Sequence, residues 1–167
     1  MKKLIFITLA LFSFIMKAQD TPITAFLEKW NNSKDYLLKI AEIMPEENYT
    51  FKPTEREMTF EEQLLHIKQN MDWLGNAYFN APKIDAHKKY ANKEALINAL
   101  IASFNNIYNA IEKTRETDLK QKVDFFAGEK TKLQTLNLLQ DHVTHHRGQL
   151  IIYLNLNNIE PPKYIGW

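Results

Sequence analysis

The feature of this sequence that most constrains its fold is a helical repeat of apolar residues, which recurs in four separate stretches. Within each stretch, apolar side chains follow one another at intervals of three and four residues, which places them on one face of an α-helix. No stretch after the first twenty residues shows sustained alternation of apolar and polar residues, the pattern typical of a half-buried strand. The sequence therefore predicts four amphipathic helices, which cover residues 23–44, 60–81, 92–115 and 132–157.

The ends of these helices are marked by prolines and by one capping pattern. Pro45 ends the first helix, and Pro82 ends the second. Thr59 and Glu62 have the spacing of a capping box, which predicts that the second helix begins beside Thr59. Because helices of about twenty residues are about 30 Å long, we predict an all-α fold, an antiparallel four-helix bundle with one or more longer crossings.

A long loop is predicted between the third and fourth helices. It contains an apolar patch, residues 123–128, within a polar segment that runs from Thr117 to Thr131. We predict that this patch is a short extended segment packed over the end of the bundle. A lid is the alternative interpretation.

The first eighteen residues have the form of a secretory signal peptide. Lys2 and Lys3 give a cationic start, and residues 4–16 form an uncharged apolar run. A helix of that length spans about 20 Å, which is short of a bilayer core of about 30 Å, so no stable membrane anchor is expected. Cleavage is expected near Ala18, to within one or two residues, and leaves residues 19–167 as a single exported domain, periplasmic or secreted. A buried core helix is the alternative interpretation of the run.

The composition excludes several classes of site. The chain has no cysteine, so disulfides, thiolate metal sites and thiol nucleophiles are excluded, and a metal ion would need histidine or carboxylate ligands. The 21 basic and 20 acidic residues give a net charge of +1, and removal of Lys2, Lys3 and Lys17 with the signal peptide leaves 18 basic residues and a charge of −2. We therefore expect no nucleic-acid partner.

Two histidines on the fourth predicted helix have the spacing of a metal site. His142 and His146 belong to a stripe that begins at Leu139 and ends at Leu156. At about 100° per residue their imidazoles point about 40° apart and lie one turn apart along the axis, so both can reach one ion. The alternative is a pair of core histidines that are hydrogen-bonded to neighbouring helices. His145 could also chelate with His142, but it lies about 100° from His146, and we place it at the edge of the face.

A third histidine lies on the second predicted helix. His66 is beside the apolar stripe of that helix, on the flank that also carries Gln63, Asn70 and Trp73. It is a candidate third ligand from a facing helix. Three histidines with an open position for water or substrate are typical of catalytic rather than structural metal ions. His87 lies in a loop and is assigned to the surface.

Two motifs on these helices resemble the DinB-like (damage-inducible) family. They are Gln63-Leu64-Leu65-His66-Ile67 and His142-Val143-Thr144-His145-His146-Arg147-Gly148-Gln149, with further matches at Tyr49-Thr50-Phe51-Lys52-Pro53 and at the Pro161-Pro162 tail. The resemblance covers residues 21–165. It implies a four-helix bundle with a divalent metal ion, zinc or nickel in several members, held by His66, His142 and His146. His145 is not a ligand in this mapping.

The family resembles bacterial S-transferases and isomerases that use low-molecular-weight thiols such as bacillithiol or mycothiol. Those enzymes are cytoplasmic, whereas this chain is expected to be exported. We predict a metal-dependent enzyme, transferase or hydrolase-like, that acts on a small-molecule substrate, and we keep as an alternative a non-catalytic metal-binding or stress-associated module. A homodimer is a further expectation. No catalytic side chain is assigned, because no acid belongs clearly to the inner face; Asp72 and Asp141 are candidate hydrogen-bond partners of the ligands.

Five residues near the histidines have expected roles. Arg147 is expected to bridge to an acid on a neighbouring helix, or else to orient a substrate anion. Gly148 is expected to allow close approach of another backbone or of a ligand, and Gln149 to hydrogen-bond a ligand imidazole. Tyr153 and Asn70 are candidates to line the pocket, with core packing as the alternative for the first and a surface position for the second.

Overall fold

The computed structural model describes residues 20–85 and 88–167 of the chain. The predicted signal peptide, its cleavage site and His87 lie outside the described residues. In order, the elements are α1 (Pro22–Ile43), η1 (Glu46–Asn48), α2 (Phe60–Phe79), α3 (Lys93–Glu112), η2 (Glu116–Lys120), β1 (Lys122–Val123), β2 (Lys130–Thr131) and α4 (Lys132–Leu156). No helix within the described ranges carries an apolar stretch that would reach across a bilayer.

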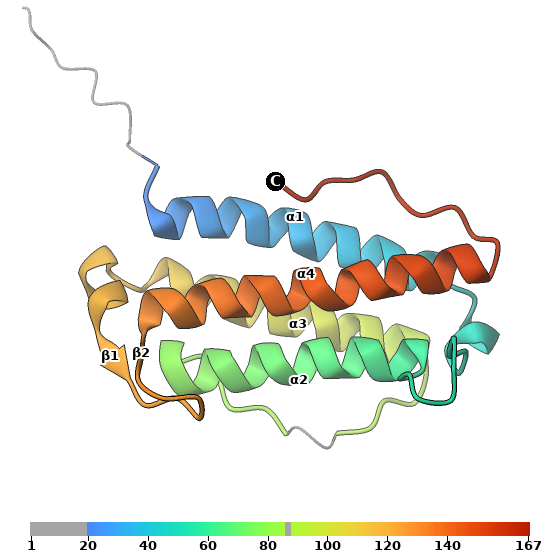
Figure 1. Ribbon diagram of the computed structural model, residues 1–167, viewed down its shortest axis with the longest axis horizontal. Coiled ribbons are helices and arrows are strands. Elements are labelled where there is room, and N and C mark those ends of the chain that lie inside the picture. Colours follow the sequence, from blue (N-terminus) through green and yellow to red (C-terminus); the bar gives the residue numbers. More distant parts are fainter. Residues whose placement is uncertain (1–19, 86–87) are drawn as a thin grey trace, which may run out of the picture.

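The four helices pack as a bundle in which each helix lies against two others (Figure 1). α1 contacts α3 and α4, and α2 contacts the same two helices. The Ile23 N–H at the start of α1 donates to the Glu116 carboxylate just after α3, and the Lys93 ammonium at the start of α3 donates to the Met44 carbonyl just after α1. α1 and α3 are therefore antiparallel. The predicted all-α four-helix bundle is confirmed.

The directions of the helices require a long crossing between α2 and α3. In Figure 1, α1 and α4 run one way and α2 and α3 run the other, so the chain travels back along the bundle after α2. The predicted long loop between the third and fourth helices is also present, and it carries η2 and both strands. As a result, α2 and α4 lie side by side and antiparallel, and these are the two helices that carry the candidate ligands.

Threonine capping boxes begin three of the four helices. Thr59 Oγ1 accepts from the Glu62 N–H at 3.1 Å, and the Glu62 carboxylate accepts from the Thr59 N–H at 2.7 Å, which confirms the predicted start of α2. α1 and α4 begin in the same way, at Thr21 and Thr131. α2 ends where Asn80 adopts a left-handed backbone with φ 58°, a common way to terminate a helix.

The buried face of α4 differs from the predicted stripe. Val143 and Leu154 are fully buried, whereas Leu156, at the end of the predicted stripe, is 54% exposed. The prediction is right for Leu139, His146 and Tyr153, which are buried, and wrong for Leu156. Apolar residues lie on several sides of this helix, so the sequence allows overlapping stripes, and contact with both α1 and α2 selects one of them. The selected face includes His146, with the half-buried His142 at its edge.

The apolar patch of the long loop belongs to a short hairpin at one end of the bundle (Figure 1). β1 and β2 pair antiparallel. Between them, the ring of Phe125 lies 6.0 Å from the ring of Trp73 on α2, and the Tyr78 hydroxyl donates to the Asp124 carbonyl at 3.1 Å. The predicted extended and packed segment is present only in part, because residues 126–128 form a turn and Phe126 is 83% exposed.

Candidate metal centre

α2 and α4 bring three imidazole rings together at their contact. His66 comes from α2, and His142 and His146 come from successive turns of α4. One ring nitrogen from each of the three lies within 4.8 Å of the others. His66 Nε2 and His142 Nε2 lie 3.1 Å apart. The structure therefore assembles the predicted set, while His145 is exposed, as expected.

The His146 ring is held in one orientation by two glutamines. Its Nδ1 lies 2.7 Å from Gln63 Oε1 and 3.1 Å from Gln149 Oε1. Because amide oxygens only accept hydrogen bonds, Nδ1 carries the ring proton and Nε2 keeps its lone pair. The expected hydrogen bond between Gln149 and the imidazole of His146, a candidate ligand, is confirmed.

The role of Gln63 is one that the sequence analysis missed. Its Nε2 donates to the Tyr153 hydroxyl at 3.4 Å, and that hydroxyl donates to the Met58 carbonyl at 2.6 Å. This chain of bonds turns the Gln63 oxygen toward His146. The sequence spacing could have indicated this role, because Gln63 precedes His66 by three residues and so lies on the same side of α2.

Burial keeps the two imidazoles of α4 neutral at neutral pH. It lowers the pKa of His142 to about 4, with further lowering by the nearby rings of His146, His66 and His145. Burial likewise lowers the pKa of His146 to about 4, helped by His66 and His145 and opposed by the hydrogen bond to Gln149. A neutral imidazole is the form that binds a metal ion, so both rings are ready to act as ligands without losing a proton.

The distance between two of the rings is close to that required by a zinc-like divalent ion. Zinc binds imidazole nitrogen at about 2.0–2.1 Å, so two nitrogens on one tetrahedral ion lie about 3.3 Å apart. The separation of 3.1 Å between His66 Nε2 and His142 Nε2 is close to that value. Imidazole also suits nickel, copper and iron. The assignment of His66, His142 and His146 as ligands stays a prediction.

The expected acidic partner of Arg147 and the expected approach of another backbone to Gly148 are both wrong. Arg147 is buried against α1, where its guanidinium donates to Ser33 Oγ at 3.1 Å and lies 4.9 Å from the centre of the Tyr36 ring, so its described partners include no acid. Gly148 is exposed, and nothing lies within 4 Å of the position that a Cβ would take, so no backbone approaches it. The sequence could not show which helix each of these residues faces.

The candidate carboxylate partners are engaged elsewhere or face solvent. Asp72 is buried in an ion pair with Lys68 on the same helix, at 2.6 Å. Asp141 is exposed. Among the described residues, the hydrogen-bonding partners of the His146 ring are therefore carboxamides, and they add no negative charge to the cluster.

A hollow of about 380 Å³ opens beside His66. Its wall comes from the loop before α2 and from the first half of that helix, and consists of Arg56, Glu57, Met58, Glu62, Leu65, His66 and Gln69. One of the three candidate ligands thus borders a space large enough for a small molecule.

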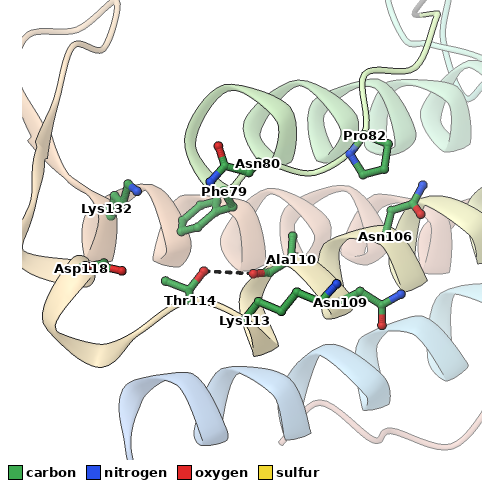
Figure 2. Close-up of a pocket in the computed structure, with 10 residues that line it drawn as sticks. All are labelled: Phe79, Asn80, Pro82, Asn106, Asn109, Ala110, Lys113, Thr114, Asp118 and Lys132. Carbon is green, nitrogen blue, oxygen red and sulfur yellow. Dashed lines mark hydrogen bonds between the residues drawn. The ribbon is translucent and has the colours of Figure 1, made fainter.

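A second hollow, of about 470 Å³, lies where α2 and α3 end and α4 begins (Figure 2). Asn106 and Lys113 line it from α3, and Lys132 lines it from α4. Its Asp118 carboxylate is already bound by the guanidinium of Arg115, at 2.7 Å. Among residues 20–85 and 88–167, no histidine lines this hollow, and it shares no lining residue with the candidate metal centre.

Known proteins resemble this chain over nearly its whole length. A family model described as the DinB family matches residues 16–164. The protein YjoA of Bacillus subtilis (strain 168) is 27% identical over 131 residues, which are 75% of this chain and 85% of that protein.

Two crystal structures show the same fold. A DinB-like protein from Bacillus cereus ATCC 10987 superposes with a TM-score of 0.73 at 17% identity, covering 84% of this chain and 95% of that chain. The DinB-like protein YjoA from Bacillus subtilis superposes with a TM-score of 0.67 at 22% identity, covering 86% and 96%. At these identities the similarity concerns the fold alone.

Proposed function

This chain belongs to the DinB family, and from that membership and its histidine cluster we propose that it is a metal-dependent enzyme acting on a small molecule. The observation that carries the proposal is the convergence of three imidazoles, one of which borders an open hollow. The hollow beside His66 leaves room for a substrate next to a site with three protein ligands, whereas a structural ion is usually enclosed by four protein ligands.

The chemistry would come from a divalent ion, zinc or nickel, held by His66, His142 and His146. When bound, such an ion acts as a Lewis acid that polarises an oxygen or acidifies a thiol. Gln63 and Gln149 keep the His146 ring turned so that Nε2 faces the other rings. This orientation is set before any substrate binds.

The hollow beside His66 would hold the substrate. Leu65 and Met58 give it an apolar part, and its wall carries the exposed Arg56 guanidinium together with the carboxylates of Glu57 and Glu62. The His146 ring has carboxamides rather than carboxylates beside it, and the chain has no cysteine. A transferase or hydrolase-like reaction at the ion therefore agrees better with these side chains than does covalent catalysis by a thiol.

Metal analysis of the purified protein tests the proposal. We expect the wild-type chain, offered zinc and nickel in turn, to retain about one ion per chain after gel filtration. The double variant His142→Ala/His146→Ala should retain none, and His145→Ala, a matched change on the same helix, should behave as wild type. If the wild-type chain retains neither metal, the proposal is wrong.

The coordination of the bound ion separates the enzyme from the non-catalytic module. X-ray absorption of the zinc-loaded protein should show three nitrogen ligands from imidazole and a further ligand that an added small thiol replaces. A closed shell of four protein ligands that no small molecule alters would instead support the metal-binding module.

We also propose that the protein is exported, because residues 1–18 combine a cationic start with a short apolar run. N-terminal sequencing of the protein from its native cells should begin near residue 19. A mature protein that begins at Met1 would contradict export by cleavage.

A further inference from the structure

We propose that Asn70 is a positioning residue for His142, whose ring it orients by accepting a hydrogen bond from Nδ1–H. The inference rests on the proposed metal site, because it concerns how one candidate ligand is prepared for an ion. It begins from two buried polar atoms that have no partner. Four buried side-chain nitrogen or oxygen atoms in the described part of the chain lack a hydrogen-bond partner, and they include Asn70 Oδ1 and His142 Nδ1.

One of these atoms is a donor and the other is an acceptor. His142 Nε2 faces His66 Nε2 at 3.1 Å, on the side of the ring where the three imidazoles meet. If Nε2 is the ligand atom, the proton of the neutral ring is on Nδ1, which must then donate. A carboxamide oxygen can only accept. The two atoms therefore have complementary needs, and buried polar groups in native proteins are nearly always paired.

The helix geometry places the two side chains near each other. Asn70 follows His66 by four residues, so it lies one turn along the same flank of α2. α2 and α4 are antiparallel neighbours, and helical side chains lean toward the N-terminus of their own helix. Asn70 thus leans back toward the level of His66, while His142 leans along α4 toward the level of Asn70. Rotation of the carboxamide, or one bridging water, joins the two atoms.

The arrangement at His146 shows what this contact would achieve. There, carboxamide oxygens from Gln63 and Gln149 hold Nδ1–H and leave Nε2 free. With Asn70 on His142, both candidate ligands of α4 are fixed in the same tautomer by neutral amides. Without it, the His142 proton can move to Nε2, which then points a hydrogen at the place where an ion would bind.

Zinc affinity measured by competition with a chelator tests the role of Asn70. We expect Asn70→Leu, which keeps the size of the side chain and removes its acceptor, to weaken zinc binding by about 10- to 100-fold. Asn70→Asp, which keeps an acceptor oxygen, should bind zinc within a few-fold of wild type or more tightly. Asn106→Leu, a half-buried helical asparagine that lines the second hollow, is the matched control and should leave zinc affinity unchanged.

A second measurement follows the tautomer itself. Nitrogen NMR of histidine-labelled, metal-free protein should show His142 protonated on Nδ1 in wild type and in Asn70→Asp, with a shift toward protonation on Nε2 in Asn70→Leu. A purely structural role for Asn70 would lower stability without changing this tautomer.

These results separate the two proposals. If wild type binds no zinc, the proposed function fails, and the tautomer of the metal-free protein still decides the role of Asn70. If wild type binds zinc and Asn70→Leu binds it equally tightly, the inference about Asn70 is wrong while the metal site stands. Equal losses of affinity in the Leu and Asp variants would also overturn it.

Discussion

His146 and Arg147 are neighbours in the chain and both are buried, with 7% and 3% of their surface exposed, but they face different helices. His146 faces α2, where Gln63 accepts from its ring, and Gln149, one turn along α4, accepts from the same ring nitrogen. Arg147 faces α1, where Ser33 is its hydrogen-bond acceptor. On the His146 side, neutral imidazoles that could bind a metal ion converge next to a hollow. On the second side a cation is enclosed by packed side chains.

The Arg147 side is closed by aromatic rings. Tyr36 lies under the guanidinium, and Tyr164 of the C-terminal segment packs edge-on against Tyr36 with ring centres 6.2 Å apart. Burial lowers the pKa of Arg147, and the nearby phenols of Tyr36 and Tyr164 partly oppose that effect. The comparison teaches that a buried polar residue beside a motif is not itself a functional signal. The convergence of several neutral imidazoles beside a hollow is a stronger signal of function.

The largest expected effect tests whether Arg147 acts through packing. Arg147→Ala should lower the free energy of unfolding by about 2–5 kcal/mol, because it removes a large buried side chain and leaves a cavity. Arg147→Met should cost less than about 1 kcal/mol or stabilise the fold, since an apolar chain of similar length replaces a buried charge without an acidic partner. Urea unfolding of both variants measures the difference. If Arg147→Met lost zinc binding, Arg147 would be part of the metal centre, and the contrast between the two sides of α4 would fail.

Acid should destabilise the metal-free protein through His146, on the side of α4 that faces α2. The folded pKa of His146 is about 4, below the ordinary value of 6.5, so the unfolded chain takes up a proton first as the pH falls. Stability is therefore lost between pH 6.5 and pH 4, with no further loss from this ring below pH 4. The pKa shift of His146 limits the loss of unfolding free energy from this ring to about 3 kcal/mol.

Urea unfolding at several pH values, in the presence of a chelator, measures this loss. The variant His142→Gln/His146→Gln removes both low-pKa imidazoles and should show a smaller loss over the same range. Equal losses in the variant and the wild type would mean that other groups, chiefly carboxylates, cause the acid sensitivity.

Bound zinc should raise the free energy of unfolding by slightly less than acid lowers it through His146. A ligand that binds only the folded state adds about 2.7 kcal/mol at a concentration one hundred times its dissociation constant. The melting temperature of wild type should therefore rise with zinc, and that of His142→Ala/His146→Ala should not. Arg147→Met should keep the full increase, since it lies on the other side of the helix. A similar zinc response in the double variant would place the bound ion elsewhere on the protein.

The smallest effect concerns Gly148, which directly follows His146 and Arg147 in the sequence but whose Cβ position contacts neither region. Because the space around its Cα is open and it lies inside α4, Gly148→Ala should stabilise the protein by about 1 kcal/mol. Thermal and urea unfolding measure the gain. A loss of stability, or a change in zinc affinity, would show that this position needs glycine after all.

Much of the fold could be predicted because it depends on local signals. The capping pair Thr59 and Glu62 marks the start of α2 within the sequence itself, since both hydrogen bonds join residues three apart. The rotation of α4 could not be predicted in this way. Leu156 fits an apolar stripe along the helix but lies on the solvent side, because burial depends on where α1 and α2 lie.

Local spacing could predict two of the candidate ligands, but it could not predict all of their hydrogen-bond partners. The spacing of His142 and His146 fixes their mutual orientation, so the sequence could offer them as a pair. Gln149 was foreseen because it lies one turn from His146 on the same helix. Gln63 was not, because its contact with His146 crosses between helices, and its orientation depends on Tyr153.

The sequence by itself determined that this chain forms four amphipathic helices and that its chemistry, without cysteine, depends on histidine. It also determined which histidines share a helix face, because the geometry of one helix is set by local hydrogen bonds. Only the tertiary structure decided that His66 meets His142 at 3.1 Å, that Arg147 faces α1, and that a hollow opens beside His66. These facts depend on how one helix is rotated against another, and that rotation is set by packing across the bundle.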